Sequence, residues 1–99
     1  MSKTFAERLA EDRRLVILRL LEQTPGYFAN ESLIHSSLAD FGLAVSRDQV
    51  RTDLSWLAEQ GLATNEDVAG VMVVCATTRG LDTAAGRAIV PGVKRPGPR

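Results

Sequence analysis

Apolar residues recur with helical spacing in the first quarter of the chain. The segment from Phe5 to about Glu22 contains neither glycine nor proline, which favours one uninterrupted helix. One side of this helix carries four apolar residues: Phe5, Leu9, Val16 and Leu20. Leu15 and Leu18 project from the opposite side, so the apolar surface is wider than one stripe. We expect a dimer partner or a helix near the C-terminus to cover it.

A second, shorter helix is predicted after a turn. Proline and glycine in Gln23-Thr-Pro-Gly26 end the first helix, and residues 27–29 form a short extended piece. Asn30 is a favourable N-cap, and Glu31 places a negative charge at the positive end of the helix dipole. The buried side of this helix is predicted to contain Leu33, Ile34, Leu38 and Phe41.

The third helix begins at Ser46 and ends near Gln60. Gly42 ends the second helix, and Ser46 and Gln49 have the spacing of a capping box. Val50, Leu54 and Leu57 form the inner stripe, and Gly61 follows as a C-terminal cap. Two short helices joined by a tight turn that contains glycine indicate a helix-turn-helix.

A β-hairpin and a last helix complete the pattern. Residues 62–68 and 71–76 read as strands joined by Ala69-Gly70, and β-branched residues dominate the second strand. Thr77 or Thr78 caps a helix that continues through Arg87. Its apolar side contains Leu81, Ala84, Ala85 and Ala88. The predicted fold is therefore mainly α with a small β-hairpin, a winged helix-turn-helix.

The length and composition fit one small domain. Residues 1–90 are predicted to form the winged helix-turn-helix domain, and residues 91–99, PGVKRPGPR, a flexible basic tail that does not pack. No stretch approaches the roughly 18 apolar residues of a membrane span, and the acidic, polar N-terminus differs from a signal peptide. We expect a cytoplasmic protein with no membrane contact. One cysteine, Cys75, and one histidine, His35, cannot complete a zinc site, so we expect neither metal nor cofactor.

The formal net charge of zero hides a division along the chain. Residues 1–78 carry seven basic and eleven acidic side chains, whereas residues 79–99 carry five basic side chains against Asp82 alone. The sequence contains no phosphate-binding glycine loop, no metal-binding His-Glu pair and no nucleophile elbow. An enzyme is therefore not expected.

Two segments carry a family resemblance. The stretch from Ser46 to Leu62 ends in the L-x-x-x-G-L pattern, and Thr77-Thr-Arg-Gly80 follows the hairpin; both resemble winged-helix regulators of the ArsR-like kind. Residues 5–95 as a whole, with FAERLAEDRRLVILRLLE, RDQVRTDLSWLAEQGL and PGVKRP, resemble small proteins of Mu-like phages and prophages. The resemblance implies a DNA-reading fold in a bacterial host cell. It does not imply metal sensing, since the cysteine and histidine clusters of ArsR-type sensors are missing.

If the third helix enters a major groove, its outward face contacts DNA. The candidate residues are Ser46, Arg47, Asp48, Gln49, Arg51, Thr52 and Ser55. Arg47 and Arg51 lead this set, because arginine pairs bidentately with guanine. Alternatively, these residues are only caps and a solvated helix face. Three acidic residues of the same helix would repel phosphate: Asp48, Asp53 and Glu59.

The remaining basic residues and the tryptophan allow two interpretations each. Lys94, Arg95 and Arg99 could bind phosphates or a minor groove, or could simply make the chain end soluble. The hairpin turn has no lysine or arginine, so wing contact with DNA is not expected. Trp56 packs in the core or on the hairpin, or lies in a partner interface.

Two functions remain. The first is a homodimeric DNA-binding protein of phage or prophage origin that regulates transcription, with residues 46–60 in the major groove of double-stranded DNA. The second is a protein-protein interaction module that keeps the fold without binding DNA. A positive strip from Arg47 and Arg51 to the tail would favour the first, and an acidic third helix the second.

Overall fold

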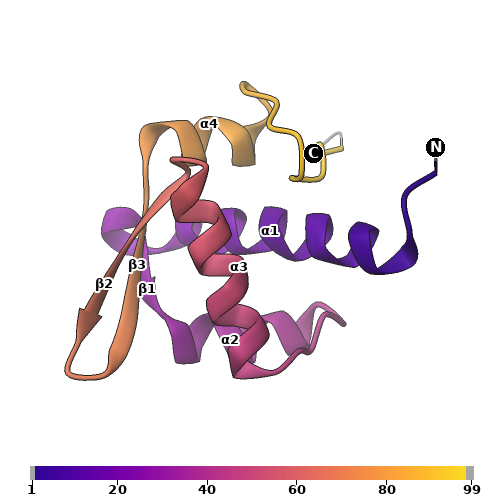
Figure 1. The fold of residues 1–99 in the computed structure, drawn as a ribbon. Helices are drawn as coiled ribbons and strands as arrows, with labels where there is room; N and C mark the ends of the chain where they lie inside the picture. Colours follow the sequence, from indigo (N-terminus) through magenta and orange to yellow (C-terminus); the bar gives the residue numbers. More distant parts are fainter. Residues whose placement is uncertain (1, 98–99) are drawn as a thin grey trace.

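The structure, a computed structural model, describes residues 2–97 and confirms the winged helix-turn-helix (Figure 1). Its elements follow the predicted order: α1 (Phe5–Gln23), η1 (Pro25–Tyr27), β1 (Phe28–Asn30), α2 (Glu31–Asp40), α3 (Arg47–Glu59), β2 (Ala63–Val68), β3 (Val71–Ala76) and α4 (Thr78–Ala85). Helix α1 runs through the middle, with α4 on one side, α2 on the other and α3 crossing it. Within residues 2–97, no helix is long and apolar enough to cross a membrane.

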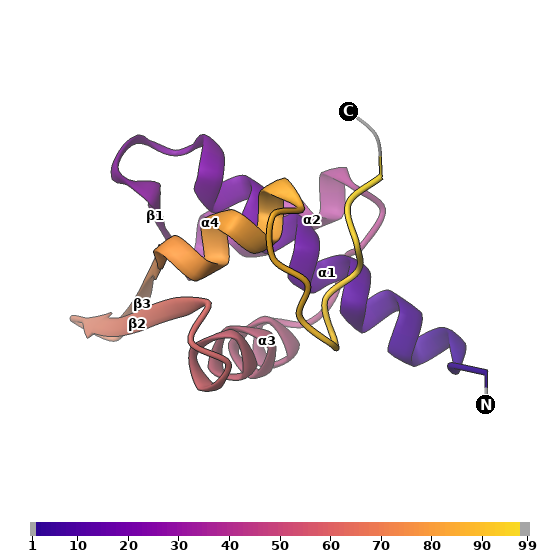
Figure 2. The same ribbon diagram turned by 90° about the horizontal axis from the view of Figure 1, so that it is seen from above.

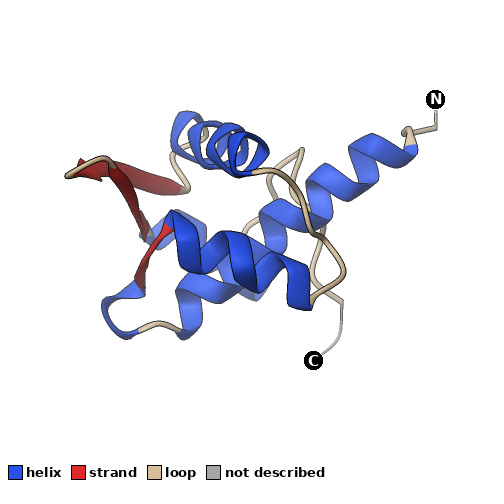
Figure 3. Cartoon of the chain, turned by 90° about the horizontal axis from the view of Figure 1, so that it is seen from below, coloured by secondary structure: helices blue, strands red, loops and turns tan. Residues whose placement is uncertain are grey.

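The strands form one antiparallel sheet in the order β1-β3-β2, at one end of the helical body (Figure 3). The predicted extended piece thus joins the hairpin as a third strand, with Ala29 opposite Val74. Ala69 and Gly70 make the hairpin turn with φ values of 54° and 85°. Positive φ at both turn residues is the geometry that matches the twist of a two-residue hairpin. The hairpin therefore projects from the body as a wing (Figure 2).

Local capping positions the helices as predicted, with one shift. The side chains of Asn30, Ser46 and Thr77 accept hydrogen bonds from the backbone N–H three residues later. Helix α4 ends at Ala85, two residues before the predicted end, because Gly86 adopts the left-handed conformation at φ 86°.

The core lies where α1, α2, α3 and the sheet meet. The predicted stripe of Val50, Leu54 and Leu57 is fully buried. In α2 the prediction holds for Ile34 and Leu38 but is wrong for Leu33 and Phe41, which are 50% and 59% exposed. Phe41 is the C-terminal cap of α2, outside the helical repeat that buries Ile34 and Leu38, and the next apolar residue to be buried is Leu43.

The predicted apolar side of α1 is also corrected. The buried residues of its C-terminal half are Leu15, Ile17, Leu18 and Leu21. On the predicted side, Leu9 and Val16 pack only partly buried against the core, and Phe5 is 76% exposed. Phe5 lies in the first turn of α1, beyond the reach of the other helices (Figure 1). Helix α4 packs on α1 beside Leu18, and both Leu15 and Leu18 are buried within the chain. The apolar surface of α1 thus gives no support to a dimer.

Gly80 makes the packing of α4 on α1 close. A Cβ atom at this position would collide with the backbone carbonyl of Leu62 and lie 3.4 Å from Cδ2 of Leu18. Only glycine therefore lets the first turn of α4 lie against α1 and against the segment that connects α3 to β2.

The expectation that the tail does not pack is wrong for residues 91–94, which follow the buried Val90. Val90 and Val93 are buried, and the backbone N–H of Lys94 donates to the carbonyl of Glu11 in α1 at 3.2 Å. Gly92 lies directly on the Trp56 ring, where a Cβ would come within 2.5 Å of Cζ2. Proline and glycine here shape a turn that carries two valines to the core. The Arg99 candidate lies outside the described residues.

Candidate nucleic-acid interface

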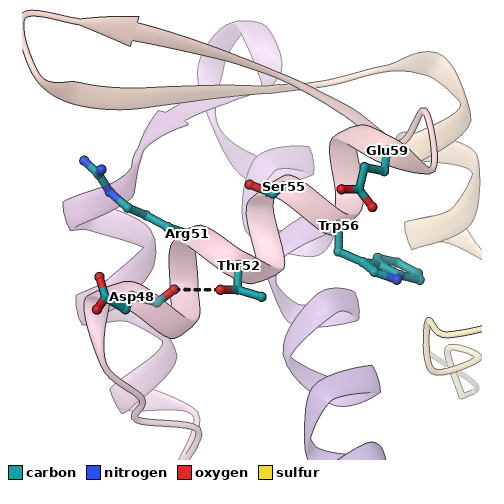
Figure 4. Close-up of a pocket in the computed structure, with 6 residues that line it drawn as sticks. All are labelled: Asp48, Arg51, Thr52, Ser55, Trp56 and Glu59. Carbon is teal, nitrogen blue, oxygen red and sulfur yellow. Dashed lines mark hydrogen bonds between the residues drawn. The ribbon is translucent and has the colours of Figure 1, made fainter.

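The outer surface of α3 is a polar face opposite its buried stripe. Figure 4 shows the side chains that line an open groove along it, which are those of Asp48, Arg51, Thr52, Ser55, Trp56 and Glu59. Four of the residues predicted to face DNA therefore lie together: Asp48, Arg51, Thr52 and Ser55. Thr52 Oγ1 donates to the carbonyl of Asp48 at 3.1 Å, and Ser55 is exposed.

Ser46 and Arg47 lie at the N-terminal end of the same face. The hydroxyl of Ser46 accepts from the backbone N–H of Gln49 at 3.1 Å, so Ser46 acts as the helix cap. The side chain of Arg47 is 51% exposed and that of Arg51 is 45% exposed. Both guanidinium groups are thus accessible from outside the protein.

Gln49 points elsewhere, which corrects the capping-box prediction. Its amide Nε2 donates to Oδ1 of Asp53 at 3.2 Å, instead of reaching back to the backbone of Ser46. Asp53 is itself buried, and its carboxylate accepts from Arg13 Nε of α1 at 2.7 Å. Asp53 therefore does not face a ligand on α3, whereas Asp48 and Glu59 remain exposed there.

Both leading arginines converge on one buried carboxylate that the sequence analysis assigned only to the helix dipole. Glu31, the first residue of α2, is 1% exposed. Its Oε1 accepts from Arg47 Nη1 at 3.2 Å and from Arg51 Nη2 at 3.0 Å, and Arg51 Nε lies 3.1 Å from Oε2. The hydrogen bond from Arg51 holds the pKa of Glu31 below its ordinary value although burial opposes this, and Glu31 in turn raises the pKa of Arg51.

The wing is tied to the same cluster. The backbone N–H of Met72 in β3 donates to Glu31 Oε2 at 3.2 Å, and Arg51 Nη2 donates to the carbonyl of Gly70 in the turn at 3.3 Å. In Figure 4, Arg51 extends toward the hairpin, whereas Trp56 points to the opposite side, toward the tail. The hairpin also carries two exposed acidic residues, Glu66 and Asp67. The wing thus brings negative charge beside α3.

Trp56 links the groove to the C-terminal tail. The guanidinium of Arg14 lies 4.0 Å from the centre of the Trp56 ring and donates to the carbonyl of Gly92 at 2.8 Å. The tail therefore passes the Trp56 end of the groove. Lys94 pairs with Asp12 of α1 at 3.9 Å, and Arg95 is exposed. The packing partner of Trp56 is thus α1 and the tail, a contact that local sequence patterns do not encode.

Neither His35 nor Cys75 is part of this surface. His35 Nε2 shares a hydrogen bond with the carbonyl of Val45 at 2.9 Å, in the turn between α2 and α3. Cys75 lies in the central strand. Across residues 2–97, no group of three or more His, Cys, Asp or Glu side chains could hold a metal ion.

Sequence comparison finds close relatives in a phage and a bacterium. The protein gp26 of Escherichia phage Mu is 55% identical over 91 residues, which cover 92% of this chain and 94% of gp26. The chain belongs to the family of phage Mu gp26. A Haemophilus influenzae protein is 51% identical over 79 residues, which cover 79% of this chain and 76% of that protein. Neither relative has an assigned function, so membership of the gp26 family defines no activity.

Structural comparison supports the fold. A mutant of Lactococcus lactis ZitR in its apo form, a winged-helix protein, superposes with a TM-score of 0.57 and 22% identity over 84% of this chain. The chain spans 58% of the length of ZitR. No family model matches the chain.

Proposed function

We propose that this chain binds double-stranded DNA with α3 in the major groove. The observation that carries the proposal is the exposed face of α3, where Arg47, Arg51, Thr52 and Ser55 lie beside a wing. The N-terminal half and outer face of the second helix of a helix-turn-helix contact the base edges. Arginine, serine and threonine supply donors for bases and phosphates.

The biological role that we propose is a phage or prophage regulator of transcription. Its support is the phage Mu relative together with the winged-helix fold. The ArsR-like resemblance of residues 46–80 belongs to this proposal, as does a homodimer that matches two half-sites of an operator. The covering of α1 by α4 means that a dimer would have to use another surface.

The first experiment measures DNA binding by fluorescence anisotropy. Fragments from the genomic neighbourhood of the gene are titrated at several salt concentrations. We expect one fragment to bind about a thousandfold or more better than the rest, with an affinity that falls steeply with the logarithm of salt. Weak, equal binding of all fragments, or none at low salt, would contradict the proposal.

A matched pair of variants locates the DNA-reading face. The test variant combines Arg47→Ala and Arg51→Ala with Glu31→Gln, so that no buried carboxylate loses its partners. The control combines Arg79→Ala and Asp82→Asn on α4 with Arg87→Ala just after it, which changes the net charge equally and removes an exposed ion pair. We expect specific affinity to fall at least about tenfold more in the test variant than in the control. A loss of about tenfold corresponds to the contribution of one bidentate contact between arginine and a base. Equal losses would contradict a reading role for α3.

One observation favours a second function, a protein interaction module. The segment from Glu31 to Val68, which includes α2, α3 and β2, holds two arginines against seven acidic residues, net −5. Five of these acidic residues are exposed, because Glu31 and Asp53 are buried, and such a surface repels phosphate and suits a basic protein partner. A fusion protein used to capture partners from phage-infected cells, with the same two variants as bait, separates the functions. DNA-independent capture of a basic protein, lost in the α3 variant, would favour this function.

A further inference from the structure

Glu31 is unusual among the buried charges because one carboxylate serves two arginines. Within residues 2–97, the other buried carboxylate is that of Asp53 in α3, which has a single arginine partner, Arg13, and that pair is neutral. Glu31 is 1% exposed and holds both Arg47 and Arg51, so its cluster has a net charge of +1. The excess positive charge is directed outward, because both arginine side chains are about half exposed.

In each guanidinium group, some nitrogen atoms donate hydrogen bonds within the protein and others do not. Arg51 uses Nε and Nη2 toward Glu31, and among residues 2–97 its Nη1 has no hydrogen-bond partner. Arg47 uses Nη1, which donates to Glu31 and to Ser32 Oγ at 3.1 Å. The outer ends of both guanidinium groups thus keep donors for an anionic or acceptor ligand.

The same carboxylate fixes the wing relative to α3. Met72 of β3 donates its backbone N–H to Glu31, and Arg51 donates to Gly70 in the hairpin turn. Three elements that are distant in sequence therefore meet at one side chain: the start of α2, the outer face of α3 and the wing. A change at Glu31 therefore affects its hydrogen bonds with Arg47, Arg51 and Met72 together.

We infer that Glu31 is a positioning residue that sets the sequence specificity of the DNA interface. It holds the two arginines in one orientation before DNA arrives, so that less side-chain freedom is lost on binding and only a matching base edge meets the outward donors. This inference rests on the proposed function. It differs from a general phosphate attraction, because removal of Glu31 raises the net positive charge and strengthens nonspecific attraction.

The test compares Glu31→Gln with Asp53→Asn in the full chain. Each variant removes one buried negative charge that pairs with arginine, so the change in net charge is matched. Affinity is measured by anisotropy for the best genomic fragment and for a scrambled duplex of equal length. We expect Glu31→Gln to lower the ratio of the two affinities about tenfold or more, with unchanged or stronger binding to the scrambled duplex. Asp53→Asn should leave the ratio unchanged.

The outcomes separate this inference from the proposed function. A wild-type chain with a specific target and a Glu31→Gln variant with an unchanged ratio would overturn the role of Glu31 and leave DNA binding intact. A wild-type chain with no specific target overturns both. If Glu31→Gln does not fold, as judged by circular dichroism, Glu31→Asp carries the test. It keeps the charge but is one methylene too short to reach Arg47, Arg51 and Met72 at once, so the ratio must again fall.

Discussion

Removal of Asp53 alone should cost more stability than removal of Asp53 and Arg13 together. The two side chains are 2% and 9% exposed, and Arg13 Nε lies 2.7 Å from Asp53 Oδ2, with Nη2 3.4 Å from Oδ1. Asp53→Ala leaves a guanidinium buried between α1 and α3 without its charge partner. Such a loss costs about 3–5 kcal/mol of unfolding free energy.

This cost is large relative to the stability of a small domain. A chain of this length is stable by about 5–15 kcal/mol, so Asp53→Ala removes about a fifth of that stability or more. At about 4–8 °C per kcal/mol, the melting temperature should fall by at least about 12 °C. The double variant Arg13→Met with Asp53→Leu fills the same space with apolar groups and should be within about 1 kcal/mol of wild type, or more stable.

Urea titrations can measure both changes in the native chain. Trp56 lies in the same helix as Asp53 and its ring contacts Gly92, so its fluorescence reports the loss of tertiary packing. Circular dichroism at the helical band reports the backbone, and coincident transitions justify a two-state treatment. An Asp53→Ala variant within about 1 kcal/mol of wild type would refute the reasoning, as would a double variant less stable than the single one.

Three further predictions concern backbone contacts and pH. Gly80→Ala should lower the unfolding free energy by about 1–3 kcal/mol or more, because the new Cβ collides with the Leu62 carbonyl; an unchanged thermal melt would contradict this packing. Gly92→Ala, at φ 96° against the Trp56 ring, should displace the tail and shift Trp56 emission toward that of a solvated indole; identical emission spectra would show that the ring keeps its cover. Because arginine contacts lower the pKa of Glu31 from 4.5, its charged form stabilises the fold above that pH, and the stabilisation is lost as pH falls through the lowered pKa. Urea titrations in acid should therefore show a smaller pH-dependent loss in Glu31→Gln than in wild type.

Several features of the fold are encoded locally and were predictable. The stripe of Val50, Leu54 and Leu57 needs only the helical repeat, and the caps at Asn30 and Ser46 need only the next three residues. The hairpin turn at residues 69–70 likewise follows from a glycine between two runs of strand formers. Each signal arises within a few positions of the residue that it concerns.

The candidate site was predictable only in part for the same reason. Helical geometry placed Arg51, Thr52 and Ser55 on one outward face. It did not reveal that Gln49 turns to Asp53, since that choice depends on a buried carboxylate paired with α1.

The sequence by itself determined the helices, the hairpin and the polar face of α3, because periodicity and capping act over one or two turns. Only the tertiary structure decided how charges pair and what covers α1. Arg13 and Asp53 are 40 positions apart, and Glu31 and Met72 are 41 apart. Such partners meet only after α1, α2, α3 and the wing have packed, and burial then makes the loss of one partner costly. The orientation of Arg47 and Arg51 is therefore a property of the packed domain.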